Sequence, residues 1–264
     1  AGGIGPRSQV AGSGRDAYSG TMSDISPIAP AEETPECPDC GKPEPLCVCD
    51  SLAPVENRIE VLILQHPQEQ DRLLGTARLT ALQLTKATLK IGLSWSSLSK
   101  ALGREVDPAY WAILYLGSAK VAELETDRDV VAIDRKGGLE PAQNAILNGI
   151  EGVVVLDGTW SQAKALWWRN PWMLKCQRVI LGPKQLSLYG KLRREPRSDG
   201  LSTIEATALL LARLEKRPEI AESLFGAFER MLAKYREAIK THPDLLPKPK
   251  PKRDWRKGRK SRRR

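Results

Sequence analysis

The chain has 264 residues, 41% of them hydrophobic, which is enough to bury the core of one large domain. No apolar stretch approaches the roughly 20 residues that cross a membrane, and the first residues lack the apolar segment of a secretory signal. We therefore expect a cytoplasmic protein without a membrane partner. The net charge of +9 is concentrated at one end, because residues 248–264 contain eleven Lys or Arg and one Asp, and the rest of the chain sums to −1.

Changes in composition divide the chain into four predicted segments. Residues 1–35 are rich in Gly, Ser, Ala and Pro without a hydrophobic period, which predicts disorder. Residues 36–52 contain a cysteine cluster, and residues 55–240 alternate apolar runs with helical patterns. Residues 241–264 form a basic tail interrupted by Pro. A basic tail on a nearly neutral body indicates a polyanionic partner, although a tail that only raises solubility has the same composition.

The first chemical signal along the chain is the cluster of Cys37, Cys40, Cys47 and Cys49, four thiols within thirteen residues. A cytoplasmic chain keeps thiols reduced, so disulfides are not expected. Four soft ligands on short turns suit a tetrahedral zinc ion. The predicted role of the zinc is structural, because four thiolates leave no open coordination position for catalysis. The distant Cys176 is interpreted as a buried thiol.

The hydrophobic patterns predict the order of helices and strands. In chain order they are strand 59–64, helix 77–89, strand 112–116, strand 130–134, helix 141–147, strand 153–157, helix 160–169, strand 178–181, helix 202–216 and helix 219–239. Strands that alternate with helices are typical of an α/β domain with a mainly parallel sheet.

The most informative stretch begins where strand 153–157 ends at Asp157. Gly158 permits a sharp turn, and Thr159 with Gln162 forms the pattern of a helix capping box. An acid is thereby placed at the carboxyl end of a strand beside a helix N-terminus, which is where open α/β sheets bind ligands. The alternative interpretation is that Asp157 is a turn residue and Trp160 belongs to the core.

A second capping box, Ser202 with Glu205, begins helix 202–216. If the two helix N-termini converge, their backbone N–H groups can bind an anion such as a carboxylate or a phosphate. Alternatively, each box only stabilises its own helix, by about 1 kcal/mol.

Aromatic residues and a histidine leave two further alternatives open. Trp167, Trp168 and Trp172 form a cluster, of which at least two are expected in the core, while an exposed one would be able to stack on a nucleobase. His66 follows the first strand as either a substrate contact or a structural hydrogen-bonding group.

The stretch Asp157-Gly-Thr-Trp160 resembles the D-x-T-W signature of the DTW-domain family. The resemblance covers roughly residues 37–240, because four other motifs accompany it in order: the cysteine cluster, Gln-His-Pro-Gln-Glu at 65–69, Ile-Leu-Tyr-Leu-Gly at 113–117 and Leu-Ser-Thr-Ile-Glu-Ala at 201–206. It implies a tRNA-uridine aminocarboxypropyltransferase, which moves the 3-amino-3-carboxypropyl group of S-adenosylmethionine onto N3 of a uridine in tRNA and releases methylthioadenosine. It also implies a fold similar to the trefoil-knotted SPOUT domain, with the zinc knuckle as an N-terminal appendage.

The resemblance, together with the predicted elements, assigns roles to individual residues. Asp157 is the catalytic candidate, as a hydrogen-bond acceptor that positions the imide and takes its proton late, because an aspartate is too weak a base to deprotonate an imide outright. The residues expected to bind S-adenosylmethionine are Leu114, Tyr115, Gly117, Thr159, Trp160, Ser161, Leu201, Ser202, Thr203 and Glu205. The residues expected to bind tRNA are His66, Arg72, Arg193, Arg194, Arg197, Lys252, Arg253, Arg256 and Lys257.

Three other functions remain compatible with the sequence. An RNA methyltransferase would use the same cofactor and the same class of partner. A non-catalytic RNA-binding module containing zinc would explain the cysteines and the tail, but not two capped helix starts beside acids. Aminocarboxypropyl transfer to ribosomal RNA is the third. The sequence does not define the oligomeric state or the uridine that is modified.

Overall fold

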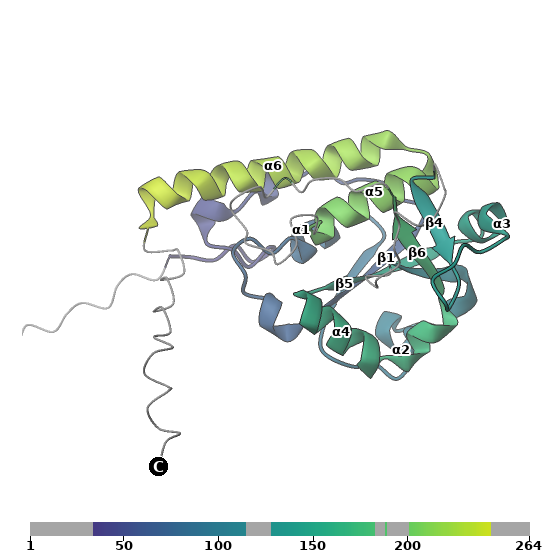
Figure 1. The fold of residues 1–264 in the computed structure, drawn as a ribbon. Helices are drawn as coiled ribbons and strands as arrows, with labels where there is room; N and C mark the ends of the chain where they lie inside the picture. The colour runs from purple at the N-terminus through teal and green to yellow at the C-terminus, as the bar shows by residue number, and fades with distance from the viewer. Residues whose placement is uncertain (1–33, 115–127, 183–187, 189–200, 244–264) are drawn as a thin grey trace, which may run out of the picture. The chain divides into compact units, whose positions relative to one another are not determined.

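The fold is built on a six-stranded sheet in the order β2-β1-β5-β3-β6-β4. A computed structural model describes residues 34–114, 128–182, 188 and 201–243. Its strands are β1 (Glu60–Gln65), β2 (Ala87–Ile91), β3 (Trp111–Leu114), β4 (Val130–Ile133), β5 (Gly152–Asp157) and β6 (Gln177–Leu181). Every neighbouring pair is parallel except β4 and β6, which are antiparallel. The predicted α/β class with a mainly parallel sheet is confirmed (Figure 1).

Helices cover both faces of the sheet (Figure 1). One face carries α2 (Leu98–Leu102) and α4 (Trp160–Arg169), and the other carries α1 (Ala77–Gln83), α5 (Thr203–Glu215) and α6 (Pro218–Thr241). The short helix α3 (Gln143–Asn148) lies beside β4. Five 3-10 helices complete the described elements: η1 (Glu44–Leu46), η2 (Cys49–Ser51), η3 (Pro67–Glu69), η4 (Pro108–Tyr110) and η6 (Pro171–Lys175).

Strand β5 shows why the central strands are continuous apolar runs. Its side chains alternate between two cores, with Val153 and Val155 packed on the α5 and α6 side and Val154 and Leu156 on the α4 side. A strand covered on both faces must be apolar at every position, which is typical of parallel sheets. The apolar run stops at Asp157, because this residue is the last of β5 and lies where the parallel strands end.

The predicted helix 77–89 is wrong in its second half. Helix α1 ends at Gln83, and Ala87–Ile91 is strand β2, which pairs in parallel with β1. Ala, Leu and Lys favour helices, so the local pattern continued the helix. Tertiary contacts override it, because the buried Asn57 accepts a hydrogen bond from the Lys86 N–H at 2.9 Å and donates to the Lys86 carbonyl at 3.1 Å. Helix α2 is a second difference, because the hydrophobic patterns predicted no helix at Leu98–Leu102.

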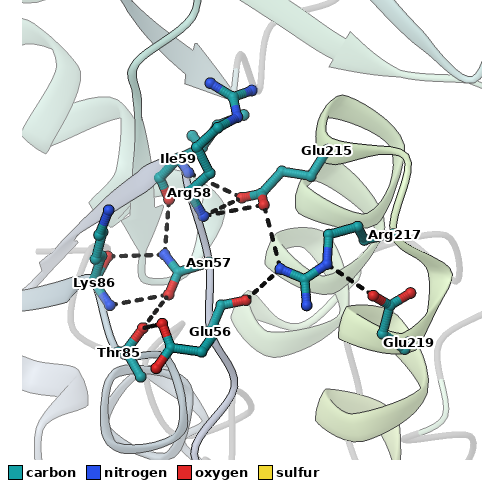
Figure 2. A network of polar contacts seen from close by, with 9 residues as sticks. All are labelled: Glu56, Asn57, Arg58, Ile59, Thr85, Lys86, Glu215, Arg217 and Glu219. Carbon is teal, nitrogen blue, oxygen red and sulfur yellow. Dashed lines mark hydrogen bonds and ion pairs between the residues drawn. The ribbon is translucent and has the colours of Figure 1, made fainter.

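A polar network fixes the start of β1 to the junction of α5 and α6 (Figure 2). The Glu215 carboxylate accepts hydrogen bonds from the backbone N–H groups of Arg58 at 3.0 Å and Ile59 at 2.9 Å. Arg217 donates to the Glu56 carbonyl at 2.8 Å and to Glu219 at 2.7 Å. Glu215 therefore satisfies backbone donors at the start of strand β1, whereas Glu219 contacts the guanidinium of a partly exposed arginine, Arg217.

We expect Glu215→Ala to lower the free energy of unfolding by about 1.5–3 kcal/mol, because two backbone N–H groups lose a charged acceptor. The Glu215 side chain is 2% exposed, so water does not replace it. Urea denaturation measures the effect. The matched control is Glu219→Ala, whose side chain is 58% exposed and whose ion pair is screened by solvent. Equal losses in the two variants would contradict the role given to Glu215.

The ends of the chain fall largely outside the described residues. This applies to the predicted disordered segment up to residue 33 and to the basic tail from residue 244, so the four-segment division remains a prediction. Among the described helices, none combines the length and the apolar character needed to span a membrane.

Candidate functional site

Asp157 lies at the carboxyl edge of the sheet and is held by two side chains from other elements. The Gln65 amide donates to Asp157 Oδ2 at 2.8 Å, and the Thr203 hydroxyl donates to Asp157 Oδ1. The Asp157 carbonyl accepts the His66 backbone N–H at 2.9 Å. Asp157 is half-buried, so its carboxylate is oriented by the protein without being sealed from solvent. An oriented and accessible carboxylate is what a general base or a substrate-positioning group requires.

Gly158 lies in the turn between β5 and α4, where its backbone closely approaches Gln162 in the first turn of α4. A Cβ atom at Gly158 would lie 2.9 Å from the Gln162 Cβ, closer than side-chain atoms approach one another. The glycine is needed for this close approach, since Gly158 is not among the glycines with positive φ. The predicted capping box is confirmed, with Gln162 Oε1 accepting the Thr159 N–H at 2.6 Å.

The N-terminus of α5 converges on the same point. Thr203, its first residue, contacts Asp157, and the Ile204 N–H donates to the Thr76 hydroxyl at 3.3 Å. The prediction of anion binding depended on the two helix starts converging. Asp157 lies beside both of them, because α4 begins three residues after it and Thr203 of α5 contacts its carboxylate. The N-termini of α4 and α5 and the Asp157 carboxylate therefore lie in one region of the molecule.

Glu205 fastens a further segment to this region. It is 2% exposed, and its Oε2 accepts hydrogen bonds from the Ser202 N–H at 2.7 Å and the Ser202 hydroxyl at 2.6 Å. Its Oε1 accepts the Leu188 N–H at 2.6 Å. The second predicted capping box is thus confirmed, and its carboxylate also holds a residue that is distant in sequence.

The other sequence-predicted residues fall into four groups. Trp160 and Ser161 are the first residues of α4 and are exposed, so Trp160 does not belong to the core. Leu114 ends β3 at the same sheet edge, and Leu201 precedes the α5 cap. His66 caps η3, with Nδ1 accepting the Gln68 N–H at 3.3 Å, and Arg72 pairs with Glu69 at 3.4 Å. The remaining ones lie outside the described residues: Tyr115, Gly117, Arg193, Arg194, Arg197, Lys252, Arg253, Arg256 and Lys257.

Sequence reasoning missed the residue that aligns Asp157. Gln65 is buried at the end of β1 and stands directly opposite Asp157 in the β1–β5 register. Gln162 was found only as a cap, although its amide also donates to Gln68 Oε1 at 3.2 Å and so links α4 to η3. A signal for Gln65 was available, because it is a polar residue that ends an apolar strand.

The four cysteines of the N-terminal segment form one cluster. Their sulfur atoms all lie within 4.8 Å of one another. Cys37 and Cys49 lie 3.8 Å apart, and Cys40 and Cys47 lie 3.7 Å apart, measured between their sulfur atoms. A tetrahedron of sulfurs around zinc, with Zn–S bonds of about 2.3 Å, has edges of about 3.8 Å. The donor set and its spacing fit a zinc ion.

The backbone around the first two cysteines forms a tight turn. Gly41 has φ +64° and donates its N–H to the Cys37 carbonyl at 2.8 Å, while the Cys37 N–H donates to the Lys42 carbonyl at 2.8 Å. The Cys40 backbone N–H lowers the pKa of the Cys37 thiol to about 7. Burial raises the pKa of Cys40 and of Cys49 above the usual value of a thiol. Metal binding must therefore displace protons from the thiols of Cys40 and Cys49.

Lys42 connects the cysteine segment to the loop that follows η3. Its Nζ donates to the Leu73 carbonyl at 2.5 Å and to the Arg72 carbonyl at 3.4 Å. Burial lowers the pKa of Lys42 to about 8. A cavity of about 20 Å³ separates the two segments, and its walls include Cys40, Lys42, Gln65 and Glu69. Because Cys40 and Gln65 line the same cavity, the cysteine cluster lies close to Gln65, the residue that orients Asp157.

The tryptophan cluster and Cys176 can be placed individually. Trp172 is buried and Trp167 is half-buried, both packed in the core on the α4 side, so the expectation for two of the three tryptophans is confirmed. Trp168 points outward and is 78% exposed. Cys176 is buried, as predicted, and burial raises its pKa to about 12.

The chain is similar to proteins with a described activity. The model of the DTW domain family matches residues 34–236. The chain is 30% identical over 212 residues to tRNA-uridine aminocarboxypropyltransferase 2 of Macaca fascicularis, a match that covers 78% of this chain and 65% of that protein. It is 30% identical to the proteins of the same name in Mus musculus, covering 87% of this chain and 73% of that protein, and in Drosophila melanogaster, covering 74% and 72%. No solved structure matches the chain.

Proposed function

Because the chain belongs to the DTW domain family, we propose that it is a tRNA-uridine aminocarboxypropyltransferase. In this proposal it transfers the 3-amino-3-carboxypropyl group of S-adenosylmethionine to N3 of a uridine in tRNA. The observation that supports it best is the convergence of the N-termini of α4 and α5 on Asp157, since this edge offers positive helix ends to an anionic group beside a hydrogen-bond acceptor.

Asp157 is proposed to act on the acceptor base. Gln65 and Thr203 each donate to one of its oxygens, which fixes the plane of the carboxylate. A fixed carboxylate accepts the N3–H of the uridine imide and holds N3 toward the electrophilic carbon. As the N3–C bond forms, the proton moves toward Asp157 and is then released to water. The carboxylate is thereby regenerated.

S-adenosylmethionine supplies an aminocarboxypropyl carbon bonded to a sulfonium, and the electrons of that carbon–sulfur bond pass to sulfur when methylthioadenosine leaves. The chain's contribution to donor binding is proposed to be orientation. The residues assigned to the donor are Leu114, Tyr115, Gly117, Thr159, Trp160, Ser161, Leu201, Ser202, Thr203 and Glu205. Among these residues, the role proposed for the buried Glu205 is indirect. Its carboxylate holds Ser202 and Leu188 in place by accepting their backbone N–H groups.

The proposal extends to the partner, the metal and the compartment. tRNA phosphates are assigned to His66, Arg72, Arg193, Arg194, Arg197 and the basic tail, and zinc is assigned to the four cysteines. A cytoplasmic location accompanies the zinc, because clustered thiols must stay reduced to bind it. A SPOUT-like trefoil knot, with loops after Leu114, after Asp157 and near Gly200, is the topology that the family resemblance implies.

Analysis of the reaction products tests this function. Unmodified tRNA is incubated with the protein and S-adenosylmethionine, and the nucleosides and small-molecule products are measured by mass spectrometry. We expect a uridine carrying the aminocarboxypropyl group and an equal amount of methylthioadenosine. A methylated nucleoside with adenosylhomocysteine would instead identify a methyltransferase. Modification of ribosomal RNA alone would reassign the substrate, and no product with either RNA would indicate a binding module.

A further inference from the structure

Helix α4 carries an outward-facing stripe that packing does not explain. Its buried side chains are Ala163 and Leu166, which face the sheet. Trp160, Lys164 and Trp168 recur every four residues on the outer side, and all three are exposed. Residues four apart lie on one face of a helix. A large aromatic side chain that is 78% exposed, as Trp168 is, contributes little to folding.

The stripe lies in a basic setting. Residues 159–178 contain four Lys or Arg and no Asp or Glu, and two of their four tryptophans, Trp160 and Trp168, are exposed. Lys164 Nζ lies 5.7 Å from the centre of the Trp160 ring, and the Arg178 guanidinium lies 5.4 Å from that of Trp167. Aromatic rings interleaved with cations, without acids, match the chemistry of a nucleic acid strand, which presents bases and phosphates in alternation.

The stripe also leads away from the candidate site. Helix α4 begins three residues after Asp157, and Trp168 lies eight residues beyond Trp160, about 12 Å along the axis. That distance accommodates a few nucleotides of an unstacked strand. A uridine presented to Asp157 must leave its stack, so the adjacent nucleotides are single-stranded near this helix.

We propose that the outer face of α4 binds the single-stranded nucleotides of tRNA that flank the modified uridine. Trp168 stacks on a base, and Lys164 and Arg169 contact phosphates. This inference rests on the proposed function for the identity of the RNA, whereas the binding surface itself is defined by α4.

The test replaces Trp168 in the full-length protein. Trp168→Ala is expected to raise the Kd for unmodified tRNA and the KM for tRNA by about tenfold, because one base loses its stacking partner. Trp168→Phe retains an aromatic face and is expected to restore most of the affinity. The affinity for S-adenosylmethionine and the kcat at saturating tRNA stay unchanged. The control is Ile239→Ala, a 41% exposed apolar residue of α6 on the other side of the sheet, which leaves tRNA affinity unaltered.

The outcomes separate this inference from the proposed function, because RNA binding is measured by filter binding without S-adenosylmethionine. If Trp168→Ala weakens tRNA binding while the unaltered protein forms no transfer product, the proposed RNA-binding surface is supported and the proposed transferase function is rejected. If transfer proceeds normally and Trp168→Ala binds tRNA as the unaltered protein does, the inference is overturned alone. It is also overturned if Trp168→Phe is as weak as Trp168→Ala, or if the change alters only the oligomeric state.

Discussion

If the proposed transfer activity holds, we expect Asp157→Asn to lower its rate at saturating substrates by at least about 100-fold, the usual contribution of a positioned proton acceptor. The variant keeps the shape of the side chain. Its Oδ1 still accepts the Thr203 hydroxyl, and the Gln65 amide can rotate to offer its oxygen to the new NH₂ group. The fold is therefore expected to survive, and the loss falls on kcat. Single-turnover transfer of a labelled aminocarboxypropyl group measures it.

Two companion measurements make this result interpretable. The Kd of the variant for tRNA, determined at fixed salt, should match that of the unaltered protein, since phosphate contacts dominate RNA affinity. Asp107→Asn is the matched control, because Asp107 caps η4 where β3 begins, at the opposite edge of the sheet from Asp157. Retention of transfer within a few-fold in Asp157→Asn would exclude Asp157 from the chemistry.

Removal of the metal is expected to have the largest effect on stability. We predict one zinc per chain by elemental analysis, and a fall in Tm of about 10 °C for Cys40→Ser, because several kcal/mol of metal-binding free energy are lost and 1 kcal/mol shifts the Tm by about 2–4 °C at this size. Cys40 is the buried member of the cluster. Cys176→Ala, which removes the remaining thiol, should retain the zinc.

The same prediction has a pH dependence. Since burial raises the pKa of Cys40 and Cys49, protons compete with the metal for those sulfurs, and zinc affinity falls as the pH is lowered. Isolation of a metal-free protein with Cys37–Cys49 and Cys40–Cys47 disulfides would contradict the zinc assignment. Peptide mapping without reduction distinguishes the two states.

Local signals were sufficient to predict where the functional helices begin. Thr159 and Ser202 each stand three residues before a Gln or Glu, and the structure has N-caps at both residues. A capping box depends on four consecutive residues, so it is legible in the sequence alone. The same holds for β5, whose apolar run ends at Asp157, the proposed catalytic acid.

Contacts between distant segments were beyond local reasoning. The residues around Gln65 and Asp157 do not indicate that β1 and β5 are neighbours, because Gln65 and Asp157 are 92 residues apart in the sequence. The direction of β4 is likewise absent from its own residues, because antiparallel and parallel strands can share one composition. Strand β2 was read as helix since its pairing with β1, and the Asn57 bonds that begin it, are tertiary.

The strand order has a consequence for how the protein is made. Strand β1 leaves the ribosome before its inner neighbour β5, which follows only after 92 further residues, and Thr203 comes 46 residues later still. Pairings of such long range cost loop-closure entropy before they gain contacts, which slows folding. During synthesis the apolar strand β1 lacks its inner neighbour and can pair with other exposed strands. We therefore expect chaperones to matter most in the interval before β5 emerges.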